Sequence, residues 1–279
     1  MTEFLSALAT HGFLQAALLA GILASIGCGV MGTYVVVKRI GFLAGGISHS
    51  VLGGMGAALF FNQDPMHGAL VAAVGSALVI GWITLRFQEH EDTLISAFWA
   101  VGMAAGILFI AKTPGYGVDL MSYLFGNILL VAPQDLWLMA GLDLVLVAAV
   151  AVYYRPLLAV TFDEEFARLR GIPVTLFHLL LLCLVAVTVV LLIRVVGLIL
   201  VIALLTLPAA VAAQYASTLG RIMALATALG ATFATAGLAV AYDADLPAGA
   251  TIILVAGAVY LASTLWQGVR RRQARLRGA

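Results

Sequence analysis

Nine long runs of apolar residues dominate this 279-residue chain and constrain its fold more than any other feature. A helix needs about 20 mostly apolar residues to cross the hydrocarbon core of a bilayer. Only 10% of the residues are charged, against roughly 25% in soluble domains. The expected spans are residues 13–37, 41–61, 68–87, 93–111, 134–153, 174–193, 195–215, 222–241 and 248–267. The sequence therefore predicts an all-α, polytopic membrane protein with nine transmembrane helices, or eight as the alternative, in one transmembrane domain over residues 1–279.

The sixth and seventh runs are separated by a single charged residue, Arg194. Together they are longer than one bilayer thickness, so we expect the chain to break or turn near this arginine. Two loops, 112–133 and 154–173, are longer than simple turns. In the first of them, the segment DLMSYLFGNILL predicts a short, partly apolar helix or a re-entrant segment.

The basic residues orient the predicted spans. Cytoplasmic segments carry an excess of Lys and Arg, which places the tail RRRQARLR (270–277) in the cytoplasm. With nine spans, twelve of the 14 basic residues fall inside, and only Lys112 and Arg194 fall outside. The inside residues are Lys38, Arg39, Arg86, Arg155, Arg168, Arg170, Arg221, Arg270, Arg271, Arg272, Arg275 and Arg277. A wrong span count would mix the two sides, so this distribution supports nine spans and a cytoplasmic C-terminus.

The cytoplasmic segment 161–173 has the pattern of a short helix. Acidic residues come first and basic residues follow, which suits the helix dipole, and Thr161 is the expected N-cap. Gly171 and Pro173 are expected to end the helix. The charged residues of the pattern are Asp163, Glu164, Glu165, Arg168 and Arg170. Such a helix is either a solvated connector or a lever that docks into a cytoplasmic partner, and the residues alone leave both interpretations open.

Motifs for ATP hydrolysis and for a zinc protease are absent from the sequence, which has neither G-x-x-x-x-G-K-[ST] nor H-E-x-x-H. The energy for any transport must therefore come from an ion gradient or from a separate ATPase subunit. A nucleophilic enzyme is also disfavoured, because Ser48 and Ser50 adjoin His49 and adjacent residues on a helix do not face each other. Cys28 and Cys183 lie inside apolar runs and are expected to be buried thiols rather than a disulfide.

Four ionisable residues fall inside the predicted spans or at their edges, namely His49, Asp143, His178 and Arg194. A charge at the bilayer centre costs about 2.5–3.5 kcal/mol on insertion scales, so each of them needs a physical reason. Asp143 is expected to pair with another helix or to bind a cation. His178 lies one turn inside its span and can reach the interface, and Arg194 can snorkel from the proposed turn.

His49 is the most informative of the four, because glycines surround it. Its neighbours on the same helix face are Gly45, Gly46, Leu52 and Gly53. Such glycines expose backbone and let another helix or an ion approach closely. The site is therefore either a glycine-packed helix interface with a hydrogen-bonded histidine, or a neutral imidazole that binds a transition metal on a path lined by Gly45, Gly46 and Gly53.

Four segments resemble the membrane permeases of zinc, manganese and iron ABC importers. KRIGFLAGGISHSVLGG (38–54) resembles the second-helix signature of that family, and DEEFARLRGIPV (163–174) resembles its acidic-to-glycine cytoplasmic segment. VVGLILVIALLTLPAAVAAQYA (195–216) resembles its leucine-rich run that ends in Pro-Ala-Ala. YDADLPAGATIILVAGAVYLAS (242–263) resembles its Asp-Leu-Pro-x-Gly lead into the last helix. The segments follow in the order of the family and cover most of the chain.

The resemblance implies a homodimeric permease of the bacterial inner (plasma) membrane, paired with cytoplasmic ATP-binding subunits and supplied by an extracytoplasmic metal-binding protein. It implies a transport subunit rather than an enzyme, with no permanent cofactor and no nucleic-acid partner. His49 falls on the family's transmembrane histidine and would contact the ion in transit. The contact with the ATPase would be made by Asp163, Glu164, Glu165, Arg168 and Gly171.

The resemblance fails at one position. The family commonly has an aspartate one turn before this histidine, where this chain has Gly45. The missing oxygen ligand disfavours manganese more than zinc, because manganese prefers oxygen ligands. Asp143 is a candidate replacement, whereas Asp243 and Asp245 are expected to cap the outer surface before Pro247. We therefore expect an importer of divalent transition metal ions, with zinc ahead of manganese and iron. The alternatives are a permease for iron-chelate or corrinoid ligands and a gradient-driven metal transporter.

Overall fold

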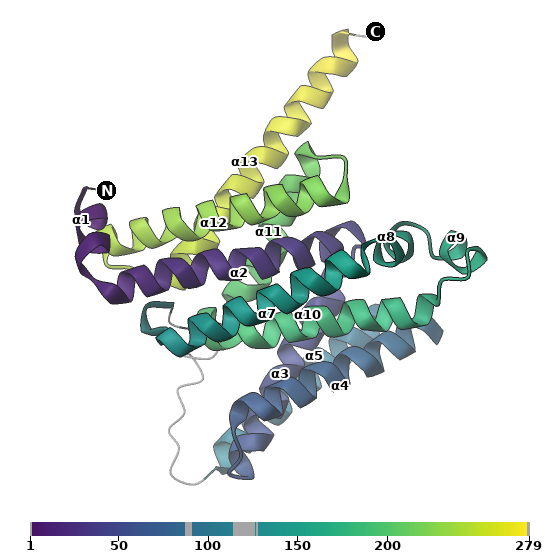
Figure 1. Cartoon of the computed structure of the whole chain (residues 1–279), viewed down its shortest axis with the longest axis horizontal. Helices are drawn as coiled ribbons and strands as arrows, with labels where there is room; N and C mark the ends of the chain where they lie inside the picture. The colour runs from purple at the N-terminus through teal and green to yellow at the C-terminus, as the bar shows by residue number, and fades with distance from the viewer. Residues whose placement is uncertain (1, 87–90, 114–125, 127, 278–279) are drawn as a thin grey trace.

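The computed structural model describes residues 2–86, 91–113, 126 and 128–277, and every regular element within them is helical (Figure 1). The elements are α1 (Thr2–Thr10), α2 (Gly12–Val37), α3 (Gly41–Phe60), α4 (Pro65–Arg86), α5 (Glu91–Lys112), the 3-10 helix η2 (Ile128–Leu130), α7 (Pro133–Val152), α8 (Tyr154–Phe162), α9 (Glu164–Leu169), α10 (Val174–Val196), α11 (Leu198–Tyr215), α12 (Leu219–Ala244) and α13 (Ala248–Arg277). Nine of these helices are long and apolar enough to cross a membrane, and they overlap the nine runs predicted from the sequence. The prediction of an all-α polytopic membrane protein is confirmed, with nine candidate spans in the described part of the chain.

The chain breaks between α10 and α11 at Gly197, shortly after Arg194. As one straight helix, α10 and α11 would measure about 60 Å, roughly twice the thickness of the bilayer core. Gly197 has φ 77° and ψ 161°, a conformation that residues with a Cβ rarely adopt. The predicted turn near Arg194 is confirmed, and a glycine rather than the arginine makes it.

α3 is the least hydrophobic of the candidate spans and also the most buried. Its mean hydropathy is 1.3 and 67% of its central window is buried, whereas α5 has a mean hydropathy of 2.2 and only 11% of its window is buried. Lipid selects apolar side chains on outer helices, while helices that face other helices can carry small and polar residues. The helix that bears His49 is therefore shielded within the protein.

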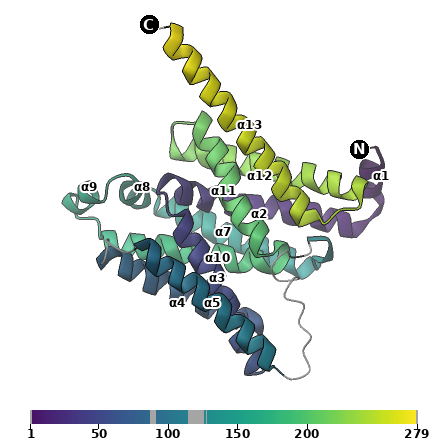
Figure 2. The ribbon, with the colours of Figure 1, turned by 180° about the vertical axis from the view of Figure 1, so that it is seen from behind.

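Two groups of helices pack side by side, and the views from the front and from behind agree on their arrangement (Figure 1 and Figure 2). One group contains α3, α4 and α5, and the other contains α2, α11, α12 and α13. α10 contacts members of both groups, among them α4, α3, α2 and α11. His49 on α3 thus belongs to the first group, whereas Asp143 on α7 packs against the second through α2.

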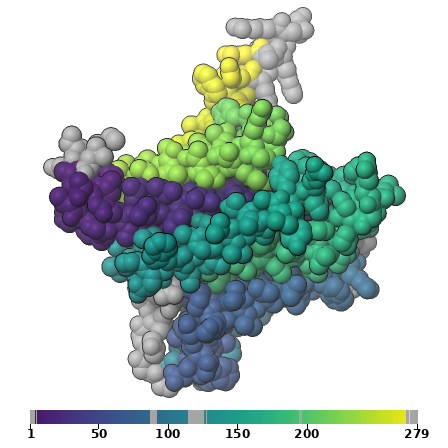
Figure 3. Space-filling view, in the orientation of Figure 1, coloured from purple at the N-terminus to yellow at the C-terminus, as the bar shows by residue number. Residues whose placement is uncertain are grey.

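α13 extends beyond the body of the molecule, as its yellow end in Figure 3 shows. Its 30 residues span about 45 Å, more than one crossing of the bilayer core requires. Polar side chains fasten its middle to the end of α11. Ser263 Oγ donates to Gln214 Oε1 at 2.6 Å, and Gln267 Nε2 donates to the Gln214 carbonyl oxygen at 2.9 Å. The arginine-rich tail is therefore a helical continuation of the last span.

The 112–133 loop is described only near its ends. Most of the segment DLMSYLFGNILL, for which a short helix or re-entrant segment was expected, lies outside the described residues. The described part includes η2 and Gly126, which has φ 61° and lies with its backbone against Val196 and Gly197. This end of the loop therefore packs on the break between α10 and α11.

Both cysteines are free thiols, Cys28 buried and Cys183 partly buried. The prediction that they do not form a disulfide is confirmed.

Candidate functional site

His49 lies in the middle of α3 and is buried, with 9% of its surface exposed. Its imidazole stacks on the indole of Trp99 from α5, with ring centroids 3.9 Å apart and 15° between the ring planes. The Nδ1 atom is buried and has no hydrogen-bond partner among the described residues. A neutral imidazole nitrogen is the donor that transition metals commonly bind. The histidine is therefore held across the helix interface by stacking on an aromatic ring, a contact that the sequence did not indicate.

The glycines around His49 bring α3 and α5 into close contact. A Cβ added at Gly46 would lie 2.6 Å from Ile95 Cγ2, and one added at Gly53 would lie 2.9 Å from the Gly102 carbonyl oxygen. Real Cβ atoms essentially never come so close to other atoms, so only glycine fits at these two positions. In this conformation α5 packs directly on the glycine face of α3 at Gly46 and Gly53.

Gly45 lies one turn before His49 and contacts the same indole. A Cβ added at Gly45 would lie 3.1 Å from Trp99 Cζ3, which is tighter than nine in ten Cβ contacts in proteins. The indole of Trp99 also lies 6.1 Å from the ring of Phe42, measured between centroids. The aromatic ring therefore fills the space beside His49 into which a side chain at position 45 would extend.

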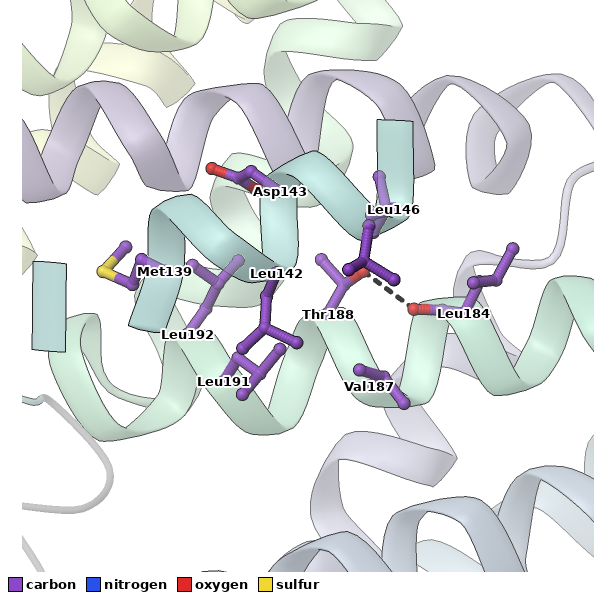
Figure 4. A pocket seen from close by; sticks show the side chains of 10 residues that line it. Met139, Leu142, Asp143, Leu146, Leu184, Val187, Thr188, Leu191 and Leu192 are labelled. Atoms are coloured by element: carbon purple, nitrogen blue, oxygen red, sulfur yellow. Dashed lines mark hydrogen bonds between the residues drawn. The ribbon is translucent and has the colours of Figure 1, made fainter. Parts of the chain in front are cut away.

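Asp143 lies on α7 and turns its carboxylate toward α2 (Figure 4). The Oδ1 atom lies 2.8 Å from the place where a Cβ on Gly27 would be, so the carboxylate packs closely on α2 at a glycine. The Oδ2 atom is buried and has no hydrogen-bond partner among the described residues. Asp143 also borders a cavity of about 50 Å³ between α7 and α10, in which Thr188 is the other polar lining residue. The structure thus places Asp143 against α2, in apolar surroundings.

His49 and Asp143 are not brought together. His49 faces α5, whereas Asp143 faces α2. Asp245 caps the C-terminal end of α12 in the left-handed conformation with φ 52°, and Asp243 lies in the last turn of that helix. Across the described residues there is no group of three or more His, Cys, Asp or Glu side chains that could hold a metal ion. The described part of the chain therefore offers the imidazole of His49 as an isolated nitrogen donor.

The predicted cytoplasmic helix corresponds to α9, and Asp163 is its N-cap. Asp163 Oδ1 accepts a hydrogen bond from the Phe166 backbone N–H at 2.8 Å. Thr161, the expected cap, instead lies in the last turn of α8 and donates from Oγ1 to the Leu157 carbonyl oxygen at 2.7 Å. The prediction for Thr161 was wrong because the extended conformation that separates α8 from α9 falls at Asp163. Gly171, with φ 74°, ends the helix as predicted.

Glu164 joins α9 to the transmembrane helices. Its Oε1 atom accepts from Lys38 Nζ at 2.6 Å, and the same ammonium group donates to the Val160 carbonyl oxygen at 2.9 Å. Lys38 is the C-cap of α2, and Val160 belongs to α8. The Nδ1 atom of His178, which is buried on α10, lies 3.8 Å from the same carboxylate oxygen. His178 therefore belongs to this cluster, where α2, α8, α9 and α10 meet, and not to the surroundings of His49.

The outer face of this segment is exposed and partly apolar. Phe162, Phe166 and Leu169 are 64%, 48% and 84% exposed, and the charged residues Glu165 and Arg168 are exposed beside them. An exposed apolar patch surrounded by polar residues is typical of a contact site for another protein. The charge pattern alone does not predict this surface, but the aromatic residues Phe162 and Phe166 in a polar connecting segment are a signal for it.

Trp99 and Lys38 are the other residues that sequence reasoning missed. Trp99 is remote from His49 in the sequence and lies in an ordinary apolar run, so no local pattern pairs the two. Lys38 had been counted only as an orienting charge at the end of a span. Their roles become visible only when the packing of α3 on α5 and the contacts of Lys38 with Val160 and Glu164 are known.

Known proteins match nearly the full length of the chain. A family model described as the ABC 3 transport family matches residues 10–267. The chain is 45% identical over 253 residues to an uncharacterized membrane protein of Synechocystis, covering 91% of this chain and 90% of that one. It is 36% identical over 260 residues to the manganese transport system membrane protein MntC of Halalkalibacterium halodurans, covering 93% of this chain and 89% of that one. The solved structure of PsaBC from Streptococcus pneumoniae in complex with Fab matches with a TM-score of 0.84 at 32% identity, over 94% of each chain.

The fold and the site together define a polytopic all-α membrane protein whose innermost span carries a buried, stacked histidine. The chain belongs to the ABC 3 transport family. The resemblance read from four sequence segments is confirmed, and so is the prediction of a transport subunit rather than an enzyme.

Proposed function

We propose that this chain is the permease subunit of an ATP-driven importer of divalent transition metal ions. The observation that carries the proposal is the family match over residues 10–267, together with a relative named as a manganese transport membrane protein. The buried imidazole of His49 on the most enclosed span supports it, because a polar group at bilayer depth needs a functional reason. In this proposal a homodimer is fed by an extracytoplasmic metal-binding protein and driven by cytoplasmic ATP-binding subunits.

Zinc is the metal that the residues around His49 favour. The site offers one imidazole nitrogen, and Gly45 supplies no oxygen. Zinc accepts nitrogen ligands readily, whereas manganese prefers oxygen ligands. Manganese is the second candidate, because MntC, a relative over most of the chain, is named for it. Uptake from an equimolar mixture of the two ions separates them. We expect zinc to accumulate faster, and faster manganese accumulation would assign manganese.

We assign to the ATP-binding subunit the exposed face of α9 together with Phe162 at the end of α8. In this proposal the C-terminal tail lies on the same, cytoplasmic side. Phe162, Phe166 and Leu169 supply the exposed apolar area. A displacement of α9 would pull on α2 through the ion pair between Glu164 and Lys38. α2 in turn packs against α11 and α12, so the movement of one short helix reaches the transmembrane core.

The test uses the tagged chain co-expressed with its partner subunits and reconstituted into vesicles. We expect a nucleotide-binding subunit to co-purify, and metal to accumulate only with ATP, also when an ionophore has collapsed the ion gradients. Uptake that survives ATP depletion and stops with the ionophore would establish the gradient-driven alternative. Uptake of a chelated but not of a free metal ion would establish the chelate or corrinoid alternative.

A further inference from the structure

Trp99 contacts both unusual residues of the candidate site, the buried His49 and Gly45, which lies one turn before it and has no side chain. The ring centroids of Trp99 and His49 lie 3.9 Å apart, with 15° between the planes. The lone pair of an imidazole nitrogen lies in the plane of its ring. The indole that fixes this plane therefore also fixes the direction from which a cation can be bound.

The indole also affects the energy of a cation at this place. The face of an indole carries negative electrostatic potential and attracts positive charge within about 6 Å. An imidazole that binds a dication becomes positively charged in part, and here its ring lies parallel to the indole at a shorter distance. Trp99 is thus placed to stabilise the metal-bound state of His49 without contributing a ligand atom.

The indole of Trp99 also limits the space available to a second ligand beside His49. Position 45 lies on the His49 face, and a Cβ there would already lie 3.1 Å from Trp99 Cζ3. A carboxylate at position 45 would have to extend further into the space that the indole occupies. In this conformation the indole of Trp99 therefore lies where a carboxylate on position 45 of α3 would extend.

We propose that Trp99 is the specificity-determining and positioning residue of the His49 site: it orients the imidazole, stabilises it in the metal-bound state and excludes an oxygen ligand at position 45. The site then selects cations that accept nitrogen, such as zinc, over cations that need carboxylate oxygen, such as manganese. The inference rests on the proposed function, because it names the determinant of metal choice in that transport path.

The first experiment observes Trp99 directly in the reconstituted complex. Trp82, Trp137 and Trp266 are 52%, 81% and 60% exposed, so replacing each by Phe leaves Trp99 as the one tryptophan of this chain with little effect on packing. Site-selective labelling keeps the partner chains silent, for example with fluorotryptophan in this chain alone and fluorine NMR. We expect zinc chloride to shift the Trp99 signal, and His49→Ala to abolish the shift. Zinc uptake without any shift of the Trp99 signal would overturn the inference.

The second experiment is a double-mutant cycle on residues 45 and 99, read out as the ratio of zinc to manganese uptake. Trp99→Leu should raise the zinc concentration for half-maximal uptake about tenfold, and Trp99→Phe should raise it less because a phenyl face remains. Gly45→Asp alone should lose uptake of both metals, since the carboxylate has no room beside the indole. Gly45→Asp combined with Trp99→Leu should regain uptake and reverse the preference toward manganese.

The outcomes separate this inference from the proposed function. Trp82→Phe serves as the matched control, because Trp82 is exposed on α4 and should keep the wild-type ratio. If the wild-type complex takes up no divalent metal, the proposed function fails. If wild-type uptake is normal and the ratio is the same in Trp99→Phe, Trp99→Leu and the double variant, the proposed function stands and the role of Trp99 is refuted.

Discussion

At the scale of single residues, the ionisable side chains in the middle of α3 and of α7 differ in what they face. His49 lies between α3 and α5 against an indole, and Asp143 lies against the backbone of α2 at Gly27. The sequence predicted that His49 would lie among close helix contacts, because glycines three and four residues away are visible in a linear sequence. It could not predict Trp99, because that contact depends on how two separate helices are aligned.

Asp143→Asn tests whether Asp143 is a packing residue or a metal ligand. Asparagine keeps an oxygen toward Gly27 and removes the charge, so we expect normal metal uptake and a free energy of unfolding changed by less than about 1 kcal/mol. Thermal unfolding in detergent and uptake in vesicles measure the two effects. An uptake rate as low as that of a His49 variant, in a normally folded protein, would instead make Asp143 a ligand.

At the scale of elements, the contact between α3 and α5 explains why the second span is so rich in glycine. The two helices touch through backbone atoms at several successive turns, which bulky side chains would prevent. The sequence indicated a close approach but left its partner open as a helix or an ion. The structure assigns the contacts of Gly46, Gly53 and Gly56 to α5, whereas Gly54 packs against α4.

Gly56→Ala tests this contact. The added Cβ would lie 2.6 Å from the Gly106 carbonyl oxygen, and we expect overpacking to lower the stability by about 1–3 kcal/mol. Gly75→Ala on α4 is the matched control, because no atom lies within 4 Å of a Cβ added there. That substitution should be neutral or stabilising by up to about 1 kcal/mol, since alanine favours helix. Equal melting temperatures for the two variants would contradict the packing of α3 on α5.

The connecting segment shows where sequence reasoning about an element succeeds and where it fails. The order of acids and bases predicted α9, and its glycine predicted the end. Thr161 was expected to start the helix, two residues before the true N-cap. Thr161 and Asp163 can both cap a helix, and the extended backbone at Asp163 decides between them. The ion pair of Glu164 with Lys38 joins segments far apart in the chain and left no local signal.

Gly171→Arg tests the coupling role of this segment. We expect ATP hydrolysis to continue while metal uptake falls, because the new side chain would lie at the surface assigned to the ATPase. No atom lies within 4 Å of a Cβ added at Gly171, so a steric clash within this chain would not explain the loss of uptake. The positive φ strains most residues by about 1–2 kcal/mol, and Gly171→Asn is therefore the control, since asparagine tolerates this conformation. Normal coupling in Gly171→Arg would refute the assignment.

At the scale of the whole molecule, the helical class followed from the apolar run lengths, because only helices and closed barrels span a bilayer. The number of spans followed from the run lengths together with the distribution of basic residues. The break between α10 and α11 followed from the same length argument, although its place at Gly197 depended on a backbone angle. The arrangement of the helices did not follow, because apolar runs of similar composition do not specify their neighbours. The buried position of α3 agrees with its mean hydropathy, which is the lowest of the candidate spans.

The central claim is that a divalent metal ion passes His49 in an ATP-driven cycle. The most direct test is the initial rate of metal uptake by the reconstituted complex with His49→Ala, compared with His67→Ala, which removes an exposed histidine at the start of α4. We predict that His49→Ala abolishes uptake while the ATP-binding subunit stays bound, and that His67→Ala transports like the wild type. Wild-type uptake by the His49→Ala complex would remove His49 from the path and contradict the account.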